Sequence, residues 1–363
     1  MDYPVVGSYV FAFAVALGYF AYHDGQRQAP AAAPVQQVAA KSAPAAEPAG
    51  WTVPDVDALP DNPYGRMVRK GRELTQRTFA HLGPEVADPA MRFAGNNLAC
   101  QSCHLEAGTK EYGLPFVGVF ADFPMYRGRE GRVASLEDRI NGCMTRSMDG
   151  QPLPVDSEPM MAFVSYIKFL SSDRPIGHPT PGRGTPKLAE LDRPASPEKG
   201  AIVFEQHCAS CHGPEGRGKR VGAVGDGKGY EFPPLRGSDT FNNGAGMARL
   251  ITAASFVRAN MPFGTSHDAP VLTEEEAWDV TAYVEAMDRP QREGIDKDYP
   301  KLTEKPVDAA YGPFADSLPA EQHKYGPFQP IRDEIKKLKA KAAESKAAEG
   351  KAAEGKAAPK TTN

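Results

Sequence analysis

The sequence predicts a mostly α-helical protein with two domains of one plan in tandem, an N-terminal transmembrane helix and a disordered C-terminal tail. Three observations lead to this fold class. An uncharged apolar run opens the chain, two central blocks each carry one CxxCH motif between two helices, and the last residues repeat a KAAEG unit. At 363 residues the chain is long enough for two domains with separate cores.

The apolar run extends from Pro4 to Tyr22 and contains no charged residue. About 20 such residues cross a bilayer as a helix. A secretory signal has a positive n-region, which is missing here, so we expect residues 1–28 to be an uncleaved membrane anchor rather than a cleaved signal. A buried core helix would show more polar positions. Residues 29–55 follow as an Ala/Pro-rich tether.

The C-terminal residues 292–363 are expected to be an extended or disordered basic tail, because no large apolar residue follows Leu338. A basic arm for a partner or a lipid surface is one interpretation, and a solvated tail is the simpler one. The formal net charge of −4 provides no basic field, so we expect no nucleic-acid partner.

The second block, residues 196–291, shows the plan of both domains. Ser196 and Pro197 start a helix that runs into the motif CASCH, and a glycine-rich loop follows. Thr273 and Glu276 then form a capping box for a closing helix. Too few apolar residues lie between the helices to fill a core, so a large buried cofactor would complete it.

The first block, residues 56–180, has the same plan with an insertion. Its opening helix lies in GRMVRKGRELTQRTFAHLG, some twenty residues before CQSCH, and its closing helix is EPMMAFVSYIKFLS, with apolar residues spaced for one face. Residues 181–195 have the Pro- and Gly-rich composition of a linker between the two domains.

The motif CxxCH indicates attachment of a c-type haem. Two thiols three residues apart each form a thioether to the porphyrin, and the adjacent histidine becomes an axial ligand of the iron. A thioredoxin-like redox motif would need a βαβ context, and zinc binding would leave both histidines unexplained. We therefore expect two covalently bound haem c groups in two cytochrome c-like domains, held by Cys100, Cys103 and His104 and by Cys208, Cys211 and His212.

The sixth ligand of the second haem is predicted to be Met261. It lies in ANMPFG, where Pro262 favours extended backbone at the methionine. His/Met ligation suits electron transfer at a raised potential. A carbonyl of PPLRG, residues 233–237, is expected to accept the Nδ1 proton of His212. The other candidate ligands are Met247, Met287 and His267.

The first domain has no equivalent methionine loop, and the lone Cys143 lies there instead. A lone thiol is often only a small buried apolar group. Here it competes for the open position on the first iron, and a thiolate ligand would lower the potential of that iron. Nearby guanidinium groups would favour the thiolate. The competing ligands are Met144, Met148 and His178.

Four long strings resemble the dihaem thiosulfate dehydrogenases: GNNLACQSCHLEAG, YRGREGRVASLEDRINGCMTRSMDGQPLPVDS, YEFPPLRGSDTFNNGAGMARLITAASFVRANMPFG and LTEEEAWDVTAYV. The resemblance covers about residues 60–290. It implies coupling of two thiosulfates into tetrathionate at a His/Cys-ligated first haem, in some members reversibly, and transfer of electrons through the second haem to a cytochrome-type acceptor or an oxidase.

The resemblance also implies roles for individual residues. His104 and Cys143 correspond to the ligands of the catalytic haem, and Arg129, Arg139 and Ser147 to active-site residues. Some members place a lysine before the methionine of the second haem. Asn260 occupies that position here, which favours plain His/Met ligation by Met261.

The leading hypothesis is thus a thiosulfate dehydrogenase on the periplasmic side, where haem c is attached, anchored to the inner membrane. Two alternatives remain open. A haem subunit of a Sox-type complex would need a partner cytochrome, and a dihaem electron carrier would have Met or His on both irons and no catalysis of its own.

Overall fold

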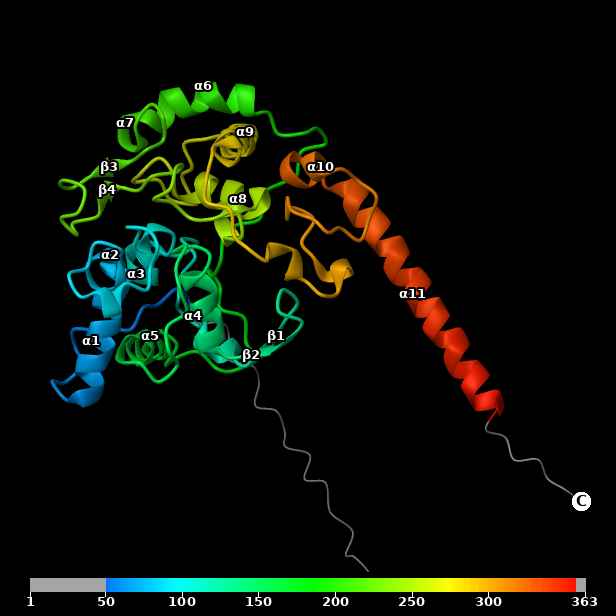
Figure 1. Ribbon diagram of the computed structural model, residues 1–363, viewed down its shortest axis with the longest axis horizontal. Coiled ribbons are helices and arrows are strands. Elements are labelled where there is room, and N and C mark those ends of the chain that lie inside the picture. The colour runs from blue at the N-terminus through cyan, green and yellow to red at the C-terminus, as the bar shows by residue number, and fades with distance from the viewer. Residues whose placement is uncertain (1–49, 357–363) are drawn as a thin grey trace, which may run out of the picture. The chain divides into compact units, whose positions relative to one another are not determined.

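The structure, a computed structural model, describes residues 50–356 (Figure 1). The first CxxCH lies in a unit built on two packed helices, α1 (Pro63–Gln76) and α5 (Glu158–Phe169). Asn62 caps α1, and Ser157 caps α5. The two helices meet at Gly71, where a Cβ atom would lie 2.1 Å from the carbonyl oxygen of Ala162, so only glycine allows this approach.

The chain between these two helices is mostly irregular and carries the motif and the hairpin of the site. Its elements are α2 (Thr78–Leu82), η1 (Pro89–Met91), η2 (Cys100–Ser102), α3 (Leu105–Gly108), η3 (Phe120–Asp122), β1 (Met125–Arg127), β2 (Arg132–Ala134) and α4 (Leu136–Met144). Strands β1 and β2 pair antiparallel, with Tyr126 opposite Val133. Buried residues of α1, α4 and α5, among them Leu74, Met144 and Met160, share one core cluster.

The second unit repeats the plan with α6 (Pro197–His207) packed on α9 (Glu274–Ala286), as Figure 1 shows. Ser196 caps α6, and Thr273 and Glu276 form the predicted capping box of α9. Between them lie α7 (Ala209–His212), the short antiparallel strands β3 (Lys219–Arg220) and β4 (Tyr230–Phe232), η4 (Gly246–Ala248) and α8 (Leu250–Asn260). The predicted pair of mostly helical domains is therefore present.

The fold-class prediction of two helical domains flanked by a membrane helix and a disordered tail needs correction. The predicted membrane helix, Pro4–Tyr22, lies outside the described residues, and between residues 50 and 356 no helix combines the length and the apolar character needed to cross a bilayer.

The predicted disordered tail is likewise corrected, because most of residues 292–356 are folded. This segment forms η5 (Ile295–Lys297), η6 (Leu302–Glu304), α10 (Ala320–Tyr325) and α11 (Gln329–Lys356). Phe328 and Ile331 are buried against Trp278 of the second unit. The sequence of residues 292–356 has no regular apolar period, so the few apolar residues that anchor this segment cannot be told from those of a tail.

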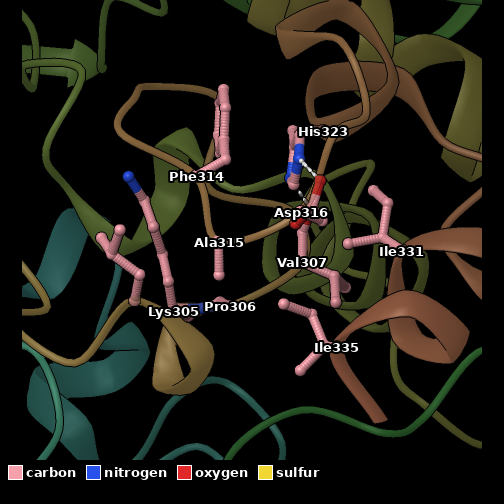
Figure 2. Close-up of a pocket in the computed structure, with 10 residues that line it drawn as sticks. Lys305, Pro306, Val307, Phe314, Ala315, Asp316, His323, Ile331 and Ile335 are labelled. Carbon is pink, nitrogen blue, oxygen red and sulfur yellow. Dashed lines mark hydrogen bonds and ion pairs between the residues drawn. The ribbon is translucent and has the colours of Figure 1, made fainter. Parts of the chain in front are cut away.

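A buried His–Asp pair fixes the turn before α11. The Nε2 atom of His323 lies 3.1 Å from Asp316, and its Nδ1 atom lies 2.8 Å from the carbonyl oxygen of Val307. Figure 2 shows this pair beside Ile331 and Ile335, which line the same small cavity. The Phe314 ring stacks on the imidazole at 3.9 Å.

Candidate active site

The first CxxCH presents its histidine in a fixed orientation. The Nδ1 atom of His104 lies 2.5 Å from the carbonyl oxygen of Leu114, which accepts its proton, and the Phe116 ring packs 4.4 Å away. The tautomer that donates from Nδ1 keeps the Nε2 lone pair available for a metal. Cys100 and Cys103 are unpaired, and burial raises the pKa of each thiol to about 12. These two thiols form no disulfide.

The structure brings Cys143 to this histidine. Helix α4 starts in the capping box of Ser135 and Asp138, and Cys143 is its second-last residue. The sulfur accepts a hydrogen bond from Arg139 Nη1 at 2.7 Å and lies beside the His104 side chain. Burial raises the pKa of the Cys143 thiol, but the Arg139 charge and the His104 contact outweigh it and lower the pKa to about 6. Cys143 is therefore held as a thiolate near neutral pH.

The three other candidates for the same position lie elsewhere. Met144 and Met148 are buried in the hydrophobic core of the first unit, and His178 is exposed in the segment after α5. The Cys143 side chain is the candidate that lies beside His104. An imidazole and a thiolate that meet in this way fit the two axial positions of a haem iron.

A cleft of about 140 Å³ opens in front of this pair, and every residue expected at the catalytic centre borders it. Second-unit residues border it as well, which the sequence did not reveal. The lining residues are Cys103, His104, Leu114, Arg127, Arg129, Glu130, Arg139, Gly142, Cys143, Arg146, Ser147, Gly246, Met247 and Thr252.

Four arginines border the cleft, and three of them have an anionic partner. Arg139 contacts the Cys143 sulfur, Arg127 pairs with Glu130 at 3.0 Å, and Arg146 pairs with Asp298 at 2.7 Å. The sequence showed Arg127 and Arg146 beside the expected residues, but nothing in it indicated that they line a cleft.

Arg129 is the fourth arginine, and it differs from the others because neutral groups hold it. Its Nη1 atom donates to the Gly244 carbonyl oxygen at 2.8 Å, and its Nε atom donates to the Tyr299 hydroxyl at 3.2 Å. Within residues 50–356 it has no ion pair with a carboxylate. Its charge is therefore available to an anion in the cleft.

The second CxxCH has the same histidine geometry as the first. The Nδ1 atom of His212 donates to the Pro233 carbonyl oxygen at 2.8 Å, which confirms the expected role of PPLRG. Burial lowers the pKa of His212, and this hydrogen bond partly offsets the effect. A neutral, oriented imidazole suits an axial ligand. Cys208 and Cys211 are unpaired, as a haem attachment site requires.

Met261 follows α8 directly and is partly buried. Val257, one turn earlier, packs in the core cluster that also holds Cys208 and Leu235, so the end of α8 faces the second motif. The rival ligands have other contacts. Met247 lines the first cleft, Met287 packs in the core cluster, and His267 lies 2.9 Å from Asp268. Met261 remains the predicted ligand.

Both halves of the described chain match known families. Residues 92–176 match the SoxA/TsdA cytochrome c domain, and residues 197–288 match the cytochrome c family. The matches fall inside the two proposed domains, 56–180 and 196–291. The fold and the two histidine sites thus define a c-type cytochrome with two haem-binding domains.

Sequence relatives narrow this class. The thiosulfate dehydrogenase of Psychrobacter arcticus is 37% identical over 68% of this chain and 71% of its own length, and that of Allochromatium vinosum is 39% identical over 66% and 84%. The thiosulfate dehydrogenase TsdBA from Marichromatium purpuratum has a TM-score of 0.61 at 36% identity, over 74% of this chain and 54% of that one. The chain belongs to the thiosulfate dehydrogenase family, and the predicted enzyme class is confirmed.

Proposed function

We propose that this protein oxidises two thiosulfates to one tetrathionate at the cleft in front of His104 and Cys143. The reaction forms one S–S bond, breaks none and releases two electrons. The observation that carries the proposal is a buried thiolate beside a haem-type histidine, in a cleft that also presents the unpaired charge of Arg129. The thiosulfate dehydrogenase relatives support this substrate.

Two covalently bound haem c groups would occupy the two CxxCH sites, where His104 and Cys143 would hold the iron of the first and His212 and Met261 that of the second. Bound there, each haem supplies one-electron redox chemistry, so two of them match a reaction that releases two electrons. His104 and His212 are both oriented by backbone carbonyls, as metal-bound histidines are.

The side chains around the cleft assemble and orient the substrate. Thiosulfate is a compact dianion, and two copies repel each other, so cations must lower the energy of bringing them together. Arg129 offers an uncompensated guanidinium, while Arg139 stabilises the Cys143 thiolate. Ser147 lines the cleft four residues after Cys143 and contributes a hydroxyl donor.

Electrons leave through the second domain to a cytochrome c-type acceptor or an oxidase. The units touch between the segment after the first motif and the segment around Met261, where Lys110 donates to the Thr265 carbonyl oxygen at 3.0 Å and Asn260 donates to that of Tyr112 at 3.1 Å. Because haem c is attached outside the cytoplasm, we place the protein on the periplasmic side.

The test is direct. Holoprotein is mixed with thiosulfate and ferricyanide or a c-type cytochrome, and tetrathionate is measured alongside acceptor reduction. We expect one tetrathionate for every two electrons accepted. The reverse reaction is assayed with tetrathionate and a reduced viologen dye. No tetrathionate from protein with both haems bound rejects the proposal.

A further inference from the structure

Arg146 has a donor atom that nothing in the described part of the chain satisfies. The residue is 8% exposed and lines the cleft. Its Nη2 atom donates to Asp298 at 2.7 Å, but its Nη1 atom is buried without a hydrogen-bond partner between residues 50 and 356. A buried guanidinium N–H without an acceptor is costly, so an acceptor is expected when the site is filled.

The unpaired atom lies beside Gly244, on which two other arginines also converge. A Cβ atom at position 244 would lie 2.8 Å from Arg146 Nη1 and 3.0 Å from Arg292 Cδ. The carbonyl oxygen of the same glycine accepts from Arg129 Nη1 at 2.8 Å. Glycine at this position thus leaves the Arg146 guanidinium uncrowded, while its carbonyl oxygen holds Arg129 close by.

This cluster is electropositive. The pKa of Arg292 is lowered, first by burial and then by the charges of Arg146 and Arg129, although Asp298 and Asp149 oppose the effect. Like charges held this close favour an anion between them.

The orientation of Arg146 is set from the C-terminal segment. Asp298 accepts from Arg146 through Oδ1 and from the Tyr311 hydroxyl through Oδ2 at 2.9 Å. The next residue, Tyr299, donates its backbone N–H to the Arg129 carbonyl oxygen at 2.8 Å. This segment lies after both family matches, which end at residues 176 and 288.

We propose that Arg146 binds a sulfonate oxygen of thiosulfate beside Arg129, and that Asp298 is the positioning residue that orients it. The inference rests on the proposed function and adds to it a second cation for the second dianion. Arg129 and Arg146 then each offer free donors to one of the two substrates that must meet. A guanidinium forms paired, charge-assisted hydrogen bonds to such oxyanions.

The experiment compares Arg146→Met and Arg146→Lys with wild-type holoprotein. It measures KM and kcat for thiosulfate, and the Kd of sulfate, an unreactive tetrahedral dianion, by calorimetry. We expect Arg146→Met to raise both KM and the sulfate Kd about 10-fold or more, equivalent to about 1.4 kcal/mol, with kcat changed less than about threefold. Arg146→Lys keeps the charge but loses the paired N–H donors of the guanidinium. Its KM and sulfate Kd are therefore expected to lie between those of wild type and those of Arg146→Met.

The matched control is Arg220→Met. Arg220 forms a comparably buried ion pair with Glu85 at 2.6 Å but does not line the cleft. It is expected to leave KM and the sulfate Kd unchanged. If Arg146→Met and Arg146→Lys stay within twofold of wild type, or Arg220→Met has an equal effect, the inference is overturned. If Arg146→Met does not retain both haems, Arg146→Lys alone decides.

Asp298 is tested by rescue. Asp298→Ala removes the acceptor and is expected to reproduce the rise in KM, whereas Asp298→Asn retains an acceptor oxygen and is expected to stay within about twofold. Equal effects of the two variants, or none in either, reject the positioning role. A wild-type protein that makes no tetrathionate but binds sulfate through Arg146 would overturn only the proposed function.

Discussion

At the scale of single residues, Cys143 shows how a thiol becomes a reactive group. Two neighbours, Arg139 one helical turn away and His104, hold its pKa at about 6 although the sulfur is buried. Burial alone would have the opposite effect, as it does at Cys100. The positive neighbours are therefore the deciding influence.

Replacing Cys143 by alanine is predicted to abolish thiosulfate oxidation while both haems stay covalently attached, because the attachment thiols are untouched. Pyridine haemochrome analysis measures haem content, and electron paramagnetic resonance is expected to lose a thiolate-ligated low-spin signal. Met148→Leu, a conservative change in the adjacent core, serves as the control. Wild-type turnover in Cys143→Ala would show that the Cys143 side chain is only a small buried group without a role in catalysis.

Glu285 is predicted to make stability fall as pH rises. Burial raises its pKa to about 7, and Arg289, 3.4 Å away, only partly opposes this. A raised carboxyl pKa favours the protonated, folded form, so stability is lost between about pH 4.5 and 7. Glu285→Gln is expected to raise the thermal midpoint at pH 8 and to leave it unchanged at pH 4.5. Equal shifts at both pH values would contradict this.

At the scale of elements, the helices that flank each motif follow from local signals, whereas the C-terminal segment does not. Ser196, Thr273 and Glu276 cap helices as expected because capping depends on neighbours in the chain. The contact between Arg146 and Asp298 spans 152 positions, and no local pattern encodes such a pair. The CxxCH motifs indicate the haem histidines and the family resemblance implies Arg129 and Arg139, whereas only the fold reveals the carboxylate that orients Arg146.

His323→Leu is predicted to loosen the C-terminal segment by about 3–5 kcal/mol, because it leaves the buried Asp316 carboxylate without its partner. Hydrogen exchange of residues 292–326 measures the effect. Adding Asp316→Leu is expected to recover part of the loss, since an apolar pair replaces a buried ionic one. His178→Leu, at an exposed position, is the control. Unchanged exchange in His323→Leu would refute the prediction.

At the scale of the whole molecule, the two haem-binding units act as one body because polar groups join them on several sides. Arg220 pairs with Glu85, and Asn242 donates to Asp149 at 2.7 Å. The cleft itself takes Gly246, Met247 and Thr252 from the second unit. The linker composition of residues 181–195 suggested independent domains, but composition carries no information about such distant contacts.

Met261→Ala is predicted to slow electron exit rather than substrate oxidation, because it lies in the second unit, away from the cleft. In stopped-flow absorbance, thiosulfate is expected to reduce the first haem at the wild-type rate, while reoxidation of the second haem by an acceptor slows about 10-fold or more. The control is Met287→Leu, which changes a methionine of the core cluster and is expected to leave the reoxidation rate unchanged. Unaltered reoxidation would remove Met261 as a ligand.

The bond from Asp298 to Arg146 also means that haem binding and substrate binding depend on different lengths of the chain. Both CxxCH motifs and every proposed iron ligand precede residue 292. A chain that stops near residue 291 would keep all of these residues but would lose the carboxylate that accepts from Arg146. Truncation at that point is therefore expected to weaken substrate binding more than haem attachment.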